Sequence, residues 1–179
     1  MNHKYGDEPD PRSAELVLGV GDVIAVNVWE NKDFNTEATI RPDGTITMPL
    51  IGDVKAAGQT PTTLKEHIKE RLGEFVKQTP GTELVTIAVR NWRSYKFTIQ
   101  GEVSRQGVYS SDTFVTVSEA IAMAGGLTRF ARRGEVKLFR FDPKTKKTRQ
   151  IPLDYDQLTS GKRLDMNIWV LAGDVISVP

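Results

Sequence analysis

The stretch from Ile40 to Val54 constrains the fold of this chain most, because it places two tight turns close together. Pro42 suits the first central position of a turn, and Gly44 accepts a positive φ without a Cβ clash. After this turn, apolar residues alternate with threonines, which is the period of a half-buried strand. Gly52–Asp53 then makes a second turn. The stretch therefore predicts a small, rigid β element with little room for a mobile catalytic loop, and its spacing favours a plain hairpin.

The length and the charge of the chain narrow the class of protein. Its 179 residues are enough for one domain, or for two small domains, with a real core. Hydrophobic residues make up 39% and charged residues 26%, as in other soluble globular proteins. The formal net charge of +1 provides no long-range field to gather DNA, RNA or an anionic membrane. We therefore expect no nucleic-acid partner.

Residue types that hold metals and cofactors are scarce. There is no cysteine, which excludes disulfides, thiol nucleophiles and thiolate zinc sites. The two histidines, His3 and His67, are far apart and lack the spacing of a metal pair. His3 lies in a polar opening run, residues 1–15, that we expect to be a disordered or vector-derived lead, and we expect His67 on a solvated helix surface. The sequence predicts no cofactor and no metal site.

Hydrophobic runs in the chain are short. No window approaches the roughly 20 apolar residues of a membrane-spanning helix. The first residues also lack the apolar core of a signal peptide. These features predict a soluble chain, and a mature protein from which a leader had been removed would look the same.

The first ordered segment is expected at Leu16–Glu30, where a glycine turn leads into a strand of alternating β-branched residues. Gly19 and Gly21 resemble half of a dinucleotide-binding fingerprint. Ile24, however, occupies the place of the third glycine, and the glycines precede a strand rather than a helix. We therefore reject a nucleotide site. The polar segment Asn31–Glu37 that follows is expected to be a loop.

The clearest helix of the sequence begins at Thr60–Pro61, where the threonine can cap the helix and the proline suits its first position. Its apolar stripe at helical spacing consists of Leu64, Ile68, Leu72 and either Phe75 or Val76. Pro80–Gly81 is expected to end the helix. Such a helix predicts an element packed against a sheet.

A strand at Leu84–Val89 is followed by a mixture of cations and aromatic residues, namely Arg90, Trp92, Arg93 and Tyr95. Such a mixture can stack nucleic-acid bases beside phosphate-binding cations. It can also place sugar faces on Trp92 or Tyr95. The third interpretation, a strand connection with half-buried aromatic residues, is the one we favour, and the near-neutral net charge weakens the nucleic-acid option further.

The second half of the chain predicts a further unit of strands and helices. In order, the expected elements are strands over residues 97–103 and 108–110, a short helix over 120–124, a hairpin of residues 135–141 with 149–153, and a short connection over 155–161. Thr116 and Glu119 match a capping box before the helix. Gly125–Gly126 provides its left-handed stop.

The end of the chain repeats the pattern of its beginning. Gly173–Asp174 launches a closing strand of β-branched residues, as Gly21–Asp22 launches the first strand. These two aspartates, with Asp43 and Asp53, could be taken for glycosidase carboxylates. Each lies at a Gly-Asp or Asp-Gly turn, where its carboxylate can bond nearby backbone amides. Turn formation is therefore the interpretation that we favour over catalysis.

In their order and spacing, these motifs resemble the outer-membrane polysaccharide export family of bacteria. Leu18–Val23, Ile40–Ile46, Met48–Gly52 and the helix begun at Thr60–Pro61 are similar to the polysaccharide export domain. Gly101–Val103, Gly107–Tyr109, Ala124–Leu127 and Gly173–Ile176 are similar to one soluble-ligand-binding β-grasp (SLBB) module. The motif residues are Gly21, Asp22, Arg41, Pro42, Asp43, Gly44, Gly52, Gly101, Gly107, Gly125, Gly126, Gly173 and Asp174.

The resemblance implies an α+β chain, with a small mixed-sheet export domain over residues 16–93 and a β-grasp module over 94–179. It implies a non-enzymatic subunit of a capsule or exopolysaccharide export complex, in the periplasm and associated with the outer membrane. The implied partners are further copies in a ring, an inner-membrane polysaccharide co-polymerase, the polysaccharide chain and, for a short member, a separate outer-membrane pore protein. Longer relatives carry a second β-grasp module and a membrane-crossing C-terminal helix, and many carry a signal peptide and an acylated cysteine.

The mechanism that we expect is passive. Oligomerisation encloses a polar passage, and hydroxyl-rich chains slide past surfaces that bind them weakly. The candidate glycan or subunit contacts are Arg90, Trp92, Arg93, Tyr95 and Tyr109. One alternative is a periplasmic glycan-binding adaptor that forms no conduit. Another is an enzyme acting on glycans, for which substitution of Asp43 or Asp53 would abolish turnover without unfolding the protein.

Overall fold

The chain folds into two units, each with its own core. The computed structural model describes residues 3–76 and 83–179. Contacts within the chain separate a first unit, Glu15–Ser94, from a second unit formed by Tyr95–Pro179 together with the described residues before Glu15. Both units combine helices with β-sheet, so the predicted α+β class is confirmed.

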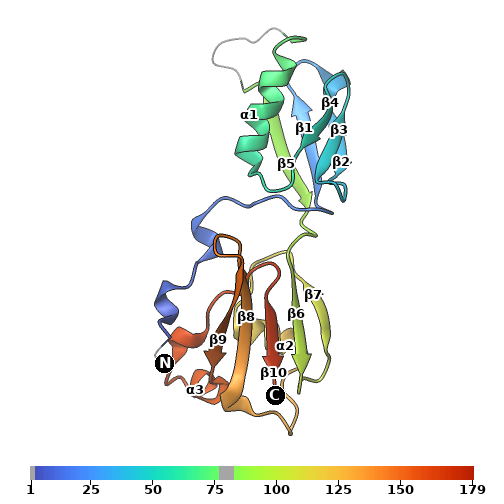
Figure 1. The fold of residues 1–179 in the computed structure, drawn as a ribbon. Coiled ribbons are helices and arrows are strands. Elements are labelled where there is room, and N and C mark those ends of the chain that lie inside the picture. The colour runs from blue at the N-terminus through green and yellow to red at the C-terminus, as the bar shows by residue number, and fades with distance from the viewer. Residues whose placement is uncertain (1–2, 77–82) are drawn as a thin grey trace. The chain divides into compact units, whose positions relative to one another are not determined.

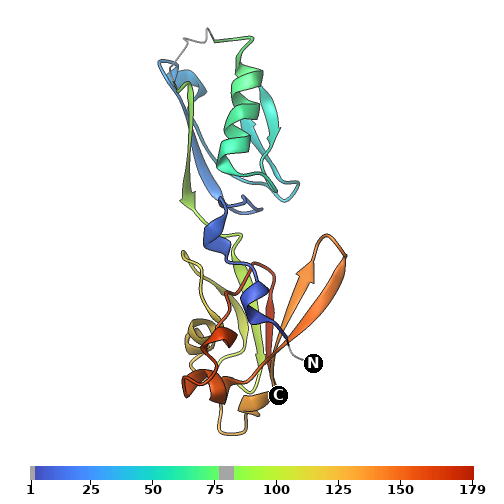
Figure 2. The same ribbon diagram turned by 90° about the vertical axis from the view of Figure 1, so that its left-hand side faces the viewer.

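The first unit contains a three-stranded antiparallel sheet, a hairpin and a long helix (Figure 1). The sheet has the strand order β2-β1-β5, and its strands are β1 (Val23–Val28), β2 (Thr36–Thr39) and β5 (Val85–Asn91). The remaining elements are the hairpin strands β3 (Thr45–Met48) and β4 (Gly52–Lys55), helix α1 (Pro61–Leu72) and a 3-10 helix at Lys32–Phe34. Figure 2 shows α1 and the hairpin on the same side of the sheet.

Alternation along β1 builds the core of the first unit. Ile24, Val26 and Val28 are buried in one cluster with the apolar residues of α1 and of the hairpin, such as Ile46 and Met48. Asn27, between two of the buried positions, is exposed. The period-two pattern predicted from the sequence therefore places the core face correctly, whereas Ala25 on the opposite face is also buried, because β1 is the central strand between β2 and β5.

Helix α1 begins and packs as its sequence predicts. The backbone N–H of Thr63 donates to Oγ1 of Thr60 at 3.2 Å, and Pro61 occupies the first helical position. Leu64, Ile68 and Leu72 are fully buried. Beyond α1, Val76 is 7% exposed and Phe75 is 52% exposed, which identifies Val76 as the residue that continues the buried stripe.

Two local predictions in the first unit differ from the structure, and a third lies outside the described residues. The expected loop Asn31–Glu37 was wrong, because the 3-10 helix lies within it and β2 begins at Thr36, which pairs with Val26 of β1. The turn expected at Gly52–Asp53 lies earlier, since Gly52 opens β4; both Leu50 and Gly52 have a positive φ, of 63° and 70°. The expected helix end at Pro80–Gly81 lies outside the described residues.

The second unit is built on a five-stranded mixed sheet in the order β7-β6-β10-β8-β9. Its strands are β6 (Lys96–Gly101), β7 (Gly107–Ser110), β8 (Val136–Asp142), β9 (Lys147–Leu153) and β10 (Val175–Val178). Its helices are α2 (Val117–Met123), α3 (Tyr155–Thr159) and 3-10 helices at Tyr5–Asp7, Pro11–Ser13, Arg133–Glu135 and Leu164–Met166. The closing strand β10 runs parallel to β6 and antiparallel to β8, so the end of the chain forms the centre of the sheet.

Both α-helices of the second unit, α2 and α3, are capped by side chains. The backbone N–H and the hydroxyl of Thr116 donate to Oε2 of Glu119 at 2.7 and 2.8 Å, which is part of the predicted capping box of α2. Ala120 on α2 is fully buried. The connection expected over Tyr155–Gly161 contains α3 instead, because Asp154 caps a helical turn there by accepting from the backbone N–H of Gln157 at 2.9 Å.

Gly101 shows why a particular glycine matters in this sheet. It pairs with Val178 of β10 and has a φ of 95°. A Cβ atom at this position would lie 1.9 Å from the carbonyl oxygen of Val178. Gly126 has a similar φ of 84°, but no other atom lies within 4 Å of the place that its Cβ would take. The two glycines therefore share a left-handed backbone and differ in steric room.

We predict that Gly101→Ala destabilises the protein more than Gly126→Ala does. Both variants should lose about 1–2 kcal/mol because a non-glycine residue is placed in a left-handed conformation. Gly101→Ala should lose about 1–3 kcal/mol more because its methyl group pushes β10 away from β6. Urea unfolding of both variants measures the difference, and equal losses would contradict the steric explanation.

Candidate functional site

The first Gly-Asp turn is closed by a buried carboxylate. Asp22 is 0% exposed, and its Oδ2 accepts from the backbone N–H of Gly19 at 2.8 Å, three residues earlier. Its Oδ1 accepts from the backbone N–H groups of Arg93 and Ser94 at 2.8 and 2.7 Å. The Ser94 hydroxyl donates to Oδ2 at 2.8 Å. One side chain thus holds its own turn and also the segment that follows β5.

The second Gly-Asp turn uses the same local device. Oδ2 of the buried Asp174 accepts from the backbone N–H of Leu171 at 2.7 Å, again three residues earlier. Gly173 and Gly21 precede the two aspartates with φ of 85° and 91°. The repeat seen in the sequence is therefore a repeat of geometry, in which a left-handed glycine lets the carboxylate turn back onto its own backbone.

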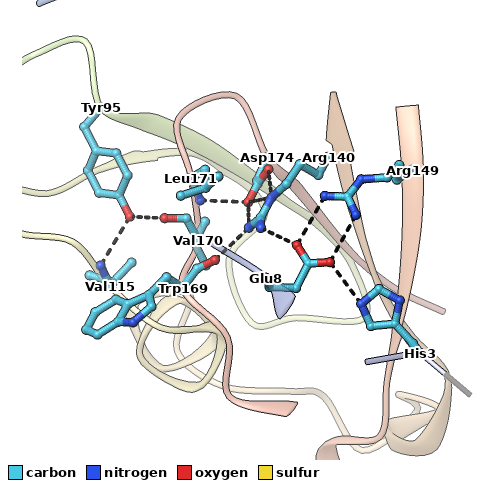
Figure 3. A network of polar contacts seen from close by, with 10 residues as sticks. All are labelled: His3, Glu8, Tyr95, Val115, Arg140, Arg149, Trp169, Val170, Leu171 and Asp174. Carbon is cyan, nitrogen blue, oxygen red and sulfur yellow. Dashed lines mark hydrogen bonds and ion pairs between the residues drawn. The ribbon is translucent and has the colours of Figure 1, made fainter. Parts of the chain in front are cut away.

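The remaining capacity of Asp174 is taken by a buried arginine of β8 (Figure 3). Nε of Arg140 lies 3.1 and 3.2 Å from the two carboxylate oxygens of Asp174, and its Nη2 lies 2.6 Å from Oδ2. Nη2 also donates to the carbonyl of Trp169 at 2.7 Å. Burial raises the pKa of the Asp174 carboxyl, and the Arg140 guanidinium opposes this shift.

The network continues into the N-terminal segment through Glu8 (Figure 3). Nη1 of Arg140 donates to Oε2 of Glu8 at 2.9 Å. Arg149 of β9 donates to both oxygens of Glu8 at 3.3 Å, and Nε2 of His3 lies 3.0 Å from Oε1. The side chains of Glu8 and Arg140 are nearly inaccessible to solvent. Glu8, Arg140 and Asp174 form what we call the buried ion network.

These contacts overturn the expectation of a disordered lead over residues 1–15, as far as its described part is concerned. Tyr5 is buried and donates from its hydroxyl to the carbonyl of Pro152 at 2.5 Å. Arg12 lies over the Trp169 ring at 4.3 Å from its centroid. The sequence shows only a polar run, because the partners of these residues lie more than a hundred positions away.

The predicted carboxylate candidates Asp43 and Asp53 meet on the exposed hairpin. Nη2 of Arg41 lies 2.9 Å from Oδ2 of each of them. The backbone N–H of Thr45 donates to Asp43 at 2.9 Å, which is the expected turn contact, whereas Asp53 accepts from the hydroxyl of Thr47 at 2.6 Å on the facing strand. The turn role expected for Asp53 was therefore wrong, because this carboxylate ties the two strands together. We call these five residues the Arg41 cluster.

The electrostatics of the Arg41 cluster do not suit general acid catalysis. Hydrogen bonds from Thr45, and then Arg41, hold the pKa of Asp43 well below its usual range. Hydrogen bonds from Thr47, and then Arg41, lower the pKa of Asp53. A glycosidase pair needs one carboxyl whose pKa is raised so that it can donate a proton. Here both carboxylates stay ionised and serve a shared arginine.

The predicted aromatic contacts fall in different places. Tyr95 is 0% exposed; its hydroxyl donates to the carbonyl of Val170 at 2.9 Å and accepts from the backbone N–H of Val115 at 3.2 Å (Figure 3). The expectation that Tyr95 is a surface contact was therefore wrong. Tyr109 is half-buried, with its ring stacked against Phe97 and its hydroxyl donating to the carbonyl of Arg105 at 2.6 Å.

The other three candidates belong to the first unit. Arg90 and Arg93 are exposed, and Trp92 is half-buried. The structure therefore divides the predicted contact residues between the two units, with Tyr95 and Tyr109 in the second.

Trp29, directly after β1, is an exposed tryptophan that was not among the predicted contact residues. It is 59% exposed and lines an open depression of about 640 Å³. The alternation of β1 placed Trp29 opposite the core face, which was the available signal.

Over residues 3–76 and 83–179, no group of three or more histidine, aspartate or glutamate residues could hold a metal ion. Within the same part of the chain, no helix has both the length and the apolar character needed to cross a membrane.

Comparison with known proteins matches both units. Residues 10–90 match the family model described as polysaccharide biosynthesis/export protein, and residues 96–152 match the SLBB domain. The capsule polysaccharide export protein BexD of Haemophilus influenzae is 26% identical over 180 residues, which cover 90% of this chain and 43% of that protein. The EPS I polysaccharide export outer membrane protein EpsA of Ralstonia nicotianae is 25% identical over 186 residues, covering 90% of this chain and 46% of EpsA.

A third relative extends the match to nearly the whole chain. The capsule polysaccharide export outer membrane protein CtrA of Neisseria meningitidis serogroup B is 23% identical over 197 residues, covering 99% of this chain and 47% of CtrA. The chain thus spans less than half the length of these curated relatives.

The fold and these matches define a two-part α+β protein in which a polysaccharide export domain, the first unit, precedes an SLBB module in the second. The chain thus carries a polysaccharide biosynthesis/export domain followed by an SLBB domain, and its relatives are capsule and exopolysaccharide export proteins. The resemblance drawn from the glycine turns is confirmed.

We predict that the buried ion network stabilises the second unit. Arg140→Met leaves Glu8 and Asp174 buried without their shared cation, and should cost about 3–5 kcal/mol of unfolding free energy. Glu8→Gln keeps the shape but removes one charge, and should cost about 1–3 kcal/mol. Asp10→Asn, which breaks an exposed pair with Arg12, serves as the control and should cost less than either. Urea unfolding measures these losses, and an equal loss of unfolding free energy for Asp10→Asn and Glu8→Gln would contradict a stabilising role of the buried ion network.

We predict that the Arg41 cluster contributes to acid sensitivity. The pKa values of Asp43 and Asp53 are lower in the folded protein than in the unfolded chain, where they are about 4. The two ionised carboxylates therefore stabilise the fold fully above about pH 4, and this contribution is lost as the pH falls through their pKa values in the folded protein. The double variant Asp43→Asn, Asp53→Asn should therefore show a smaller loss of unfolding free energy than the wild type between about pH 5 and about pH 2. Equal slopes in urea unfolding across this range would refute the assignment.

Proposed function

We propose that this chain is a non-enzymatic subunit of a capsule or exopolysaccharide export complex in the periplasm, associated with the outer membrane, and that copies of it assemble into a ring that conducts the polysaccharide. The observation that carries the proposal is the order of an export domain and an SLBB module in a chain whose relatives are polysaccharide export proteins. The inner-membrane co-polymerase and the polysaccharide are the proposed partners.

The chemistry of the described surface supports a passive role. The carboxylates of Glu8 and Asp174 are buried against Arg140, and those of Asp43 and Asp53 are ionised around Arg41. Neither arrangement offers a proton donor beside a nucleophile, as glycoside hydrolysis requires. Polar and charged surface groups such as Arg90 and Arg93 are the proposed contacts with glycan or with neighbouring subunits.

An apolar tip on the export domain is suited to contact with a second copy. Leu50, between β3 and β4, is 70% exposed and has a φ of 63°, which is unfavourable for leucine. It lines a depression with the exposed Phe75 and with Ile51, Arg71 and Glu74. Arg71 donates to the carbonyls of Ile51 and Asp53 at 2.8 and 2.7 Å. Strained, exposed apolar residues persist where a surface has a use.

We predict that the wild-type chain forms oligomers in native mass spectrometry, and that adding the periplasmic domain of the co-polymerase increases or remodels them. Leu50→Asn should lower the oligomer fraction without lowering the unfolding free energy, because asparagine tolerates the left-handed backbone that leucine strains.

Two results would count against this function. A wild-type chain that stays monomeric with and without the co-polymerase domain would argue against assembly into a conduit. A monomer that instead binds glycan saturably at one site would favour the alternative, a periplasmic adaptor that forms no conduit.

A further inference from the structure

The depression at the end of strands β1 and β5 has the chemistry of a sugar-binding site. Its wall includes the exposed indole of Trp29, and its volume of about 640 Å³ lies within the range of roughly 300–1,000 Å³ that is typical of small-molecule sites. The residues around the indole include three asparagines and a threonine. An aromatic face beside carboxamide and hydroxyl groups combines an apolar platform with hydrogen-bonding partners.

The indole is held on a rigid turn. The backbone N–H of Trp29 donates to the carbonyl of Leu84 at 2.9 Å, and Nδ2 of Asn31 donates to the carbonyl of Trp29 at 2.9 Å. The next residue, Glu30, has a φ of 56°, an unusual conformation for glutamate. Phe34 is buried and anchors the far end of the turn. Because the backbone that carries the indole is held in this way, less conformational freedom remains to be lost there when a ligand binds.

The polar groups beside Trp29 keep hydrogen-bonding capacity. Asn27 of β1 and Thr86 of β5 are cross-strand neighbours, and both are exposed. Asn31 uses its Nδ2 within the turn, which leaves its Oδ1 as an acceptor. Asn35 accepts from the backbone N–H of Val28 through Oδ1 at 2.8 Å, which leaves its Nδ2 as a donor. Donors and acceptors therefore both surround the indole, as the hydroxyl groups of a sugar require.

The charge of the depression restricts its ligand. Glu30, Asp33 and Glu83 contribute carboxylates, and Lys32 contributes a cation. Glu83 is neutralised in part by Lys65, whose Nζ lies 2.6 Å from Oε1. The remaining excess of negative charge repels uronates and other anionic sugars, and favours neutral or amino sugars.

From this geometry we propose that the Trp29 depression is a glycan subsite of the export domain, in which the face of a neutral pyranose ring lies on the indole and its hydroxyl groups bind the asparagine side chains and Thr86. The choice of ligand rests on the proposed export function. The subsite is open on one side, so it holds a passing chain weakly and releases it.

Titration of the full chain with neutral hexasaccharides, followed by NMR of the indole Nε1–H groups, tests the proposal. The probes are maltohexaose and cellohexaose, with the hexamer of galacturonic acid as the anionic comparison. We expect the Trp29 indole signal to shift with a neutral probe while the signals of Trp92 and Trp169 change little. The anionic hexamer should bind at least several-fold more weakly.

Substitution of the indole supplies the matched control. Trp29→Ala should abolish the shift of the neighbouring backbone signals, and Trp29→Phe should retain part of it. Phe141→Ala removes a comparably exposed aromatic residue, 57% against 59%, from the second unit and should leave binding unchanged. Binding that survives Trp29→Ala, no shift with either neutral probe, or preference for the anionic hexamer would overturn the subsite.

The same samples separate this inference from the proposed function. Native mass spectra without glycan report assembly, so a chain that assembles but shows no Trp29 response contradicts the subsite alone. A Trp29 signal that shifts with protein concentration in the absence of glycan would show that a second copy covers the indole, and would also overturn the subsite.

Discussion

Each of the two units depends on one buried carboxylate, that of Asp22 in the first unit and that of Asp174 in the second. A carboxylate removed from water must be supplied with donors, since an unpaired buried charge is very costly. Each aspartate takes its first donor from the backbone of its own Gly-Asp turn. Each carboxylate also accepts hydrogen bonds from a residue distant in the sequence. For Asp22 the donors are the backbone N–H groups of Arg93 and Ser94, and for Asp174 the donor is the guanidinium of Arg140.

In the second unit this requirement extends further. Arg140 lies on the core face of β8, where its alternation with neighbouring residues places it. A guanidinium buried there has more donors than Asp174 alone can use. Glu8 from the N-terminal segment supplies a second carboxylate, and Arg149 and His3 complete its surroundings. The segment before the export domain thereby becomes part of the fold of the SLBB module.

The function that we propose for this chain depends on its surfaces. The paired carboxylates of the hairpin serve Arg41, and the buried ones serve turns and the ion network. What the described surface offers instead is the exposed Leu50 at a positive φ and the exposed indole of Trp29 among polar side chains. Both suit weak contacts, with a neighbouring subunit in one case and with a passing sugar chain in the other. Such contacts fit a protein of the polysaccharide export family.

The sequence by itself determined the features that depend on neighbours along the chain. These are the alternation of β1, the capped and striped helix α1, the capping box of α2 and the order of turns that identifies the family, because each is set by residues a few positions apart. Only the tertiary structure decided the rest. The burial of Tyr95, the ordering of the N-terminal segment around Glu8 and the pairing of Asn27 with Thr86 beside Trp29 each depend on partners far away in the sequence, and local spacing carries no information about such pairings.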